Sequence, residues 1–203
     1  MKKTILACLS FIMAASLFNV NAQDISYGVK AEMNMSNFLL KDMDAFKSTM
    51  KVGPNLGGFM NIELTDNFAI QPELMFFYRT SKAEMGPAED TFKQWGMQLP
   101  VYALGQTEVG TGKFYGGVGP FVGLGFDSRF KDADVNLYDE VAGKTPMQRW
   151  DFGLGILLGY ELDNGVQFNA GYQFGFVNQI DDIAIGDAKA RTQTVNVGIG
   201  YRF

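Results

Sequence analysis

Histidine is absent from the 203-residue sequence, and cysteine occurs once, as Cys8. A single cysteine cannot form an internal disulfide, and a chain without histidine has neither a Cys/His zinc site nor a Ser-His-Asp triad. Most familiar hydrolytic enzymes use one of these arrangements. The composition therefore argues against an enzyme, and we expect no catalytic residues, no metal and no other cofactor.

Long apolar stretches are also scarce, because the only one covers residues 5–18. It is too short to cross a bilayer as a helix, it follows a basic start, and it precedes the small residue Ala22. We predict a signal peptide over residues 1–22, cleaved between Ala22 and Gln23, and one domain over residues 23–203. The chain is therefore expected to leave the cytoplasm.

Positive charge is in short supply. Removal of the expected signal peptide leaves 15 basic and 22 acidic residues, a net charge of −7. Nucleic acid is therefore not an expected partner.

Glycine and phenylalanine, in contrast, are abundant, with 24 and 18 copies. A membrane β-barrel accounts for this composition together with the lack of a second apolar stretch.

Apolar and polar residues alternate with a period of two through much of the chain, which is typical of strands with two unlike faces. The end of the sequence is the clearest case, because glycine or arginine separates Ile199, Tyr201 and Phe203. Turn residues such as Asp163-Asn164-Gly165 separate the alternating stretches. The expected strands cover residues 25–34, 51–64, 68–78, 92–106, 114–126, 152–162, 166–176 and 195–203.

The connections between these strands alternate in length. Short links are expected at residues 65–67, 108–112 and 163–165, and long ones near 41–50, 81–91, 127–148 and 179–190. An even number of strands places both termini at the short-turn end, which is periplasmic in bacterial barrels. The sequence thus predicts an all-β fold, an eight-stranded antiparallel up-and-down transmembrane β-barrel with three short periplasmic turns and four longer extracellular loops. Its expected location is the outer membrane.

Four prolines, Pro54, Pro72, Pro100 and Pro120, fall inside the expected strands. Proline has no backbone N–H, so each one removes a hydrogen bond from the ladder between strands. We therefore expect bulges or strand ends at these positions.

Alternation alone leaves open which face points outward, since a soluble lipocalin-like carrier would place its apolar face inside. Here the polar face is rich in glycine and carries few charges, which suits a narrow interior better than a solvated exterior. Charges in such an interior need opposite partners, although the sequence does not assign the pairs. The expected interior charges are Lys30, Glu32, Glu63, Glu73, Arg79, Glu161 and Arg202.

Aromatic residues of the apolar face lie near the strand ends, which predicts two aromatic girdles at the membrane surfaces. At the turn end these are Tyr27, Phe68, Phe114, Tyr160, Phe168, Tyr201 and Phe203. At the loop end they are Tyr78, Trp95, Phe126, Trp150, Phe152 and Phe176.

The expected loops are acidic. Asp132, Asp134 and Asn136 have the spacing of the first ligands of a calcium loop, but Leu137 and Gly143 replace the glycine and glutamate that such a loop requires. A solvated acidic loop is the simpler interpretation, and the same holds for Asp181, Asp182 and Asp187. Such loops can meet the divalent ions that bridge lipopolysaccharide phosphates, so we expect lipid and lipopolysaccharide as partners.

Four segments carry a family resemblance. They are Ile70-Gln71-Pro72-Glu73-Leu74 with Phe77-Tyr78, Gln98-Leu99-Pro100-Val101, Gly116-Gly117-Val118-Gly119-Pro120, and Gly198-Ile199-Gly200-Tyr201-Arg202-Phe203. In order and spacing they resemble the PorT-like outer-membrane β-barrel family of Bacteroidetes-type bacteria. The resemblance implies an outer-membrane barrel, and the family's named member is associated with protein secretion. It implies no catalytic residue.

The terminal aromatic residues have a second interpretation. A strand ending in Tyr201 and Phe203 looks like the signal that the barrel-assembly machinery recognises, although lipid contact explains these residues equally well. The leading functional hypothesis is a structural or interaction barrel that contacts envelope or secretion proteins. Alternatives are a narrow porin-like channel, a soluble lipocalin-like carrier, and a membrane-embedded enzyme, which the lack of histidine disfavours.

Overall fold

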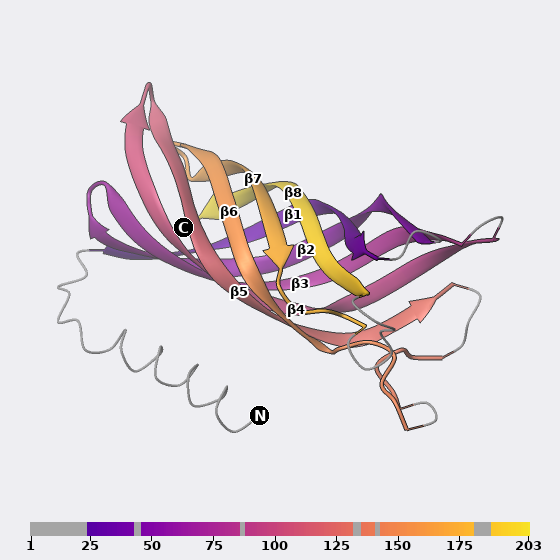
Figure 1. Ribbon diagram of the computed structural model, residues 1–203. Coiled ribbons are helices and arrows are strands. Elements are labelled where there is room, and N and C mark those ends of the chain that lie inside the picture. The colour runs from indigo at the N-terminus through magenta and orange to yellow at the C-terminus, as the bar shows by residue number, and fades with distance from the viewer. Residues whose placement is uncertain (1–23, 43–45, 86–87, 132–134, 141–142, 181–187) are drawn as a thin grey trace.

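The computed structural model describes residues 24–42, 46–85, 88–131, 135–140, 143–180 and 188–203. Each strand pairs antiparallel with the next along the chain, and the last pairs with the first, so that the sheet closes into a barrel (Figure 1). No helix in these ranges is long and apolar enough to cross a membrane. The strands are β1 (Asp24–Lys41), β2 (Phe46–Thr65), β3 (Phe68–Met85), β4 (Ala88–Val109), β5 (Gly112–Phe130), β6 (Trp150–Leu162), β7 (Val166–Gly175) and β8 (Lys189–Arg202).

The apolar face of the sheet points outward. In β6 the side chains of Phe152, Leu154 and Ile156 are about half exposed, whereas Asp151 on the other face is 7% exposed. The same alternation is visible in β1, where Lys30 and Glu32 are buried between exposed apolar neighbours. A water-soluble carrier would have the opposite arrangement, so the lipocalin-like alternative is wrong.

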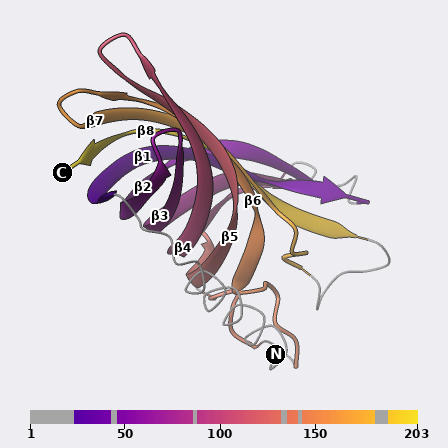
Figure 2. The ribbon, with the colours of Figure 1, turned by 90° about the vertical axis from the view of Figure 1, so that its left-hand side faces the viewer.

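The three short turns lie at one end of the barrel, together with the C-terminus (Figures 1 and 2). Asp66 and Asn67 connect β2 to β3, and Gly110 and Thr111 connect β4 to β5. Gly110 and Gly165, in the β6–β7 turn, have positive φ angles of 67° and 84°, which glycine adopts without strain. The predicted short connections are therefore present at the predicted places.

Two of the four expected long loops are mostly strand. β1 continues to Lys41 and β2 begins at Phe46, while β3 continues to Met85 and β4 begins at Ala88. These strand ends project well beyond β6 and β7 at the far end of the barrel (Figure 1). Water meets both faces of a strand beyond the lipid, so its side chains need not alternate between apolar and polar. The alternating sequence pattern therefore ends before the strand itself ends.

The two remaining long connections occur as expected, between β5 and β6 and between β7 and β8.

Among the prolines, only Pro54 lies at a break in strand register. The β2–β3 pairing shifts between Met50 and Asn55, which marks a bulge. The side chain of Asn34 occupies this bulge, and its Nδ2 donates to the carbonyl of Tyr78 at 2.9 Å and to Oδ1 of Asn55 at 2.7 Å. An amide side chain thus supplies the donor that the interrupted ladder lacks.

The expectation was wrong for Pro72, Pro100 and Pro120, which lie within strands without any shift of register. Pairs are missing beside Pro72 and beside Pro100, and the ladder then resumes in the same alignment. The loss of one donor is tolerated because intact pairs on either side still fix the alignment.

Candidate functional site

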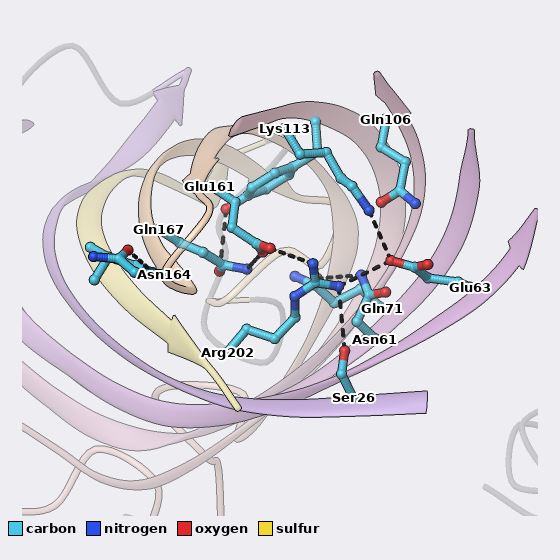
Figure 3. Close-up of polar contacts among 12 residues, drawn as sticks. Ser26, Asn61, Glu63, Gln71, Gln106, Lys113, Glu161, Asn164, Gln167 and Arg202 are labelled. Carbon is cyan, nitrogen blue, oxygen red and sulfur yellow. Dashed lines mark hydrogen bonds and ion pairs between the residues drawn. The ribbon is translucent and has the colours of Figure 1, made fainter. Parts of the chain in front are cut away.

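Charged side chains of the interior lie at three levels along the barrel, and the first is the periplasmic mouth (Figure 3). The guanidinium of Arg202, from β8, bonds to Glu161 of β6 and to Glu63 of β2, the latter at 3.0 Å. Lys113 of β5 reaches the same Glu63 carboxylate at 3.1 Å. This network borders an open cavity of about 520 Å³. It links strands on opposite sides of the mouth.

The second level lies deeper in the barrel. The ammonium of Lys30, from β1, is 2.5 Å from the carboxylate of Glu73 on β3 and 4.0 Å from that of Glu32. Gln71 donates a further hydrogen bond to Glu73 at 2.7 Å. The Lys30 side chain is fully buried. Such a buried ammonium is tolerated because carboxylates surround it.

The third level is toward the extracellular end. Arg79 of β3 donates to Oε1 of Gln98 at 2.8 Å, and its guanidinium lies 4.1 Å from the centre of the Phe77 ring. Asp151 of β6 accepts a hydrogen bond from Thr192 of β8 at 2.5 Å. Arg79 and Asp151 are close enough to interact electrostatically without forming an ion pair. The Arg79 cation is therefore in direct contact with an amide and an aromatic ring, while the Asp151 carboxylate acts on it from a longer distance.

The structure places all the expected interior charges on the inner face, and it divides them among these levels. Lys113 and Asp151 also face inward, although the recognised alternation did not include them. Each lies one residue before the stretch in which alternation was recognised, so extending the period by a single residue would have found both. The inner face also carries large side chains that the glycine-rich pattern did not suggest, namely Phe59, Met75, Phe77, Tyr102, Leu104, Tyr115 and Phe121.

Side chains fill the barrel between the mouth and the extracellular end. Tyr102, Leu104 and Leu157 are at most 3% exposed and form one apolar cluster in the interior. Above it, the amides of Asn34 and Asn55 are 0% and 2% exposed. Because these side chains are almost completely buried, the described interior has no continuous water-filled path.

A segment between β5 and β6 covers the extracellular end. The hydroxyl of Tyr138 accepts a hydrogen bond from Nε2 of Gln94 at 2.5 Å, and Sδ of Met147 accepts one from Ser128 at 3.1 Å. Both side chains pack against Phe92 and are buried. Burial raises the pKa of the Tyr138 hydroxyl above its usual value.

Aromatic side chains cover the outer surface at both ends of the barrel. Trp95 and Phe126 meet edge to face at 5.1 Å at the loop end, and Tyr201 and Phe203 at 5.6 Å at the turn end. Phe203 is 72% exposed. These positions agree with side chains that contact lipid at the membrane surfaces.

The suggested calcium ligands are only partly visible. Asp132 and Asp134 lie outside the described residues, as do Asp181, Asp182, Asp187 and the expected cleavage site at Ala22 and Gln23. Asn136 is described, and its Oδ1 accepts hydrogen bonds from the backbone N–H groups of Ser128 and Tyr138. Within the described ranges no three His, Cys, Asp or Glu side chains are arranged to hold a metal ion.

The chain is similar in sequence to a known family of membrane barrels. Residues 21–181 match the family described as outer membrane protein beta-barrel domain. No curated protein sequence matches the chain.

Two solved structures share the architecture. The outer membrane protein OprG from Pseudomonas aeruginosa is 15% identical with a TM-score of 0.55, and the match covers 88% of this chain and 95% of OprG. Neisserial surface protein A is 14% identical with a TM-score of 0.50, and the match covers 89% of this chain and 99% of that protein. At such identities the likeness concerns the fold alone.

Proposed function

Because the chain belongs to the outer membrane protein beta-barrel domain family, we propose that it is a structural or interaction protein of the cell envelope, without an open pore and without catalysis. The observation that carries this proposal is the packed interior. At the central level Lys30 is enclosed by Glu73 and Glu32, and the apolar cluster around Leu104 fills the same region. A barrel filled in this way supports neither solute flow nor substrate entry.

The surfaces left for binding are therefore the two ends and the lipid-facing side. The strands β1 to β4 extend past β6 and β7, which gives the extracellular end a rim formed by paired strands. A paired rim is stiffer than four free loops and presents a defined surface. We assign the contacts with lipopolysaccharide and with envelope proteins to this end.

A non-enzymatic role also agrees with the state of the interior side chains. Arg202 holds Glu161 and Glu63, and Lys30 holds Glu73. Carboxylates held in such ion pairs are poor general acids or bases, because their protonation would break the pair. The chain also lacks histidine.

The resemblance to the PorT-like family supports a narrower version of the proposal, in which an envelope partner belongs to a protein secretion apparatus. The residues that carry the resemblance include Gln71, Glu73 and Gln98, all of them buried inside the barrel. They support a shared barrel interior more directly than a shared partner. The secretion role therefore depends on the identification of a partner.

The first test is conductance of the purified full-length protein in planar bilayers. A side-chain-filled barrel should show no steady single-channel current. Reproducible steady channels would contradict the proposal and favour the narrow porin-like alternative.

The second test is site-specific photo-crosslinking in intact cells. A crosslinker at Lys41 or Val135, both exposed at the extracellular end, should capture a discrete envelope protein. The same crosslinker at Val197, on the lipid-facing side, serves as the matched control. If the crosslinker captures no protein at any of the three positions, the proposed interaction role is wrong.

A further inference from the structure

The extracellular half of the barrel has a gap in its strand pairing. β5 continues to Phe130, but its last partner on β6 is Trp150, opposite Leu124. On the other side, β8 begins at Lys189, but its pairing with β7 ends at Gln193. Two strands therefore continue outward, and the described residues form no strand between them.

Three non-strand segments bridge this gap by backbone hydrogen bonds. From β5, the carbonyl of Ser128 accepts from Leu137 at 2.7 Å, and the carbonyl of Leu137 accepts from Met147 at 2.9 Å. The backbone N–H of Gln148 donates to the carbonyl of Gln179 at 2.8 Å, and the N–H of Gln179 donates to the carbonyl of Ala190 in β8 at 2.9 Å. We name residues 136–139, 147–149 and 178–179 the strap.

Side chains fasten the strap to the barrel. Tyr138 and Met147 point inward to Gln94 and Ser128. Arg149 lies on the other side of Tyr138, with its guanidinium 5.4 Å from the centre of the phenol ring. The strap thus has a packed inner surface that occupies the extracellular end of the barrel.

The backbone joints of the strap are weaker than the strand ladders. Each of its four steps across the gap has one backbone hydrogen bond, whereas β6 and β7 alone share nine paired positions. One more backbone bond, from Gly125 to Arg149, and side-chain bonds of Asn136 and Asn178 also attach the strap to β5 and β8. A single hydrogen bond contributes little net stability. Local opening therefore requires far less free energy here than separation of two strands.

Some buried polar atoms in the strap and below it lack partners among the described residues. Within these ranges, Nε of Arg79, Oδ1 of Asp151 and Nε2 of Gln179 make no hydrogen bond. Each would gain water on opening, which offsets part of the free energy of detachment. Two of these residues, Arg79 of β3 and Asp151 of β6, lie close enough to Tyr138 to interact with it electrostatically.

We infer that the strap is a lid, and that the extracellular half of the barrel opens as a unit when the strap detaches. The open form is a cup with Arg79 and Asp151 at its floor. The level of Lys30 and the apolar cluster around Leu104 stay closed below it, so the lid exposes the cup without creating a pore. This inference does not depend on the identity of any partner.

The test is the reactivity of a buried thiol in the full chain, with the native Cys8 replaced by alanine. Ser128→Cys places the thiol under Met147, at a residue that is 0% exposed. Ala69→Cys places it in the periplasmic half, also at 0% exposure. In lipid vesicles, a charged methanethiosulfonate should modify the first variant slowly and leave the second unmodified.

A matched pair of glycine variants in β5 then tests the contact between β5 and the strap. A methyl group at Gly125 collides with the ring of Tyr138, whereas one at Gly123, on the same face of β5, meets its nearest neighbour at 3.7 Å. Gly125→Ala should speed modification of the Ser128→Cys thiol at least about fivefold, the effect expected from loss of one buried hydrogen bond. Gly123→Ala should leave the rate unchanged.

Three results would overturn the inference. The lid does not open if the Ser128→Cys thiol is as unreactive as the Ala69→Cys thiol. It is not a separate unit if both thiols react at the same rate, because that pattern indicates global unfolding. The strap does not control access if the two glycine variants behave alike.

Discussion

At the scale of single residues, the interior depends on matched charges. The Lys30 ammonium is fully buried and depends on Glu73 and Glu32. Removal of one partner from such a cluster leaves a charge without compensation in a medium that solvates it poorly. The intact cluster therefore contributes little net stability to the fold, whereas the removal of one partner is strongly destabilising.

We expect Lys30→Met to lower the free energy of unfolding by roughly 3–5 kcal/mol, the usual result of breaking a buried ion pair. Urea unfolding in detergent, followed by the mobility difference between boiled and unboiled protein on gels, measures this loss. Lys41→Met is the control, because Lys41 is 67% exposed and its contact with Asp42 is 3.7 Å long. Similar losses in both variants would mean that the buried cluster does not stabilise the barrel.

The residues on which the resemblance to the PorT-like family rests include several that fill the barrel interior. Gln71 donates to Glu73, Gln98 accepts from Arg79, and Pro100 is among the most buried side chains. They determine how the interior is filled. Such residues predict a fold well and a partner poorly, because a partner contacts only the surface.

At the scale of strands, close approach of backbones accounts for part of the glycine content. A methyl group at Gly119 of β5 would collide with the backbone of Val101 and with Cα of Tyr102 on β4. At Gly105 of β4 the nearest atom would be 3.8 Å away. The same residue type therefore has a packing role at one position and none at the other.

Gly119→Ala should destabilise the barrel by about 1–3 kcal/mol, as overpacking does in other well-packed interiors. Gly105→Ala should be neutral or slightly stabilising, since alanine restricts the unfolded chain. Tryptophan fluorescence during urea unfolding compares the two variants directly. An equal effect at both positions would show that strand propensity, and not backbone contact, decides the outcome.

At the scale of the whole molecule, we propose that the C-terminal strand carries a signal that is recognised during assembly of the barrel. If Phe203 is part of an assembly signal, Phe203→Ala should reduce the folded protein in the outer membrane several-fold while refolding in detergent is unchanged. Immunoblots of unboiled membrane fractions measure the folded form. Phe114→Ala removes another exposed aromatic of the same end, and an equal loss in that variant would favour simple lipid contact.

Export of the whole chain gives a further prediction. The mature protein isolated from the outer membrane should begin at Gln23, because Ala22 suits the last position before signal peptidase cleavage. Mass spectrometry of the intact protein determines this end. A mass that includes residues 1–22 would contradict the predicted signal peptide.

The alternation seen around Tyr201, along β6 and in the other stretches was sufficient to predict the strands and their number. The glycine-rich polar face, with its few charges, then predicted which face meets lipid. The rim was not predicted, because the outer ends of β1 to β4 lie beyond the lipid and water meets both of their faces. The exact interior pairs were not predicted either. Arg202 lies 41 residues from Glu161 and 139 from Glu63 in the chain, and only the closed barrel brings them together.

The sequence by itself determined that the chain is a barrel with an apolar exterior. The period of two is a local property of each strand, and the glycine-rich polar face suits a narrow interior better than a solvated exterior. The tertiary structure alone decided which charges meet, where Tyr138 is inserted, and how the strap joins β5 to β8. These are contacts between distant segments, and their geometry depends on register and closure, which no single strand encodes.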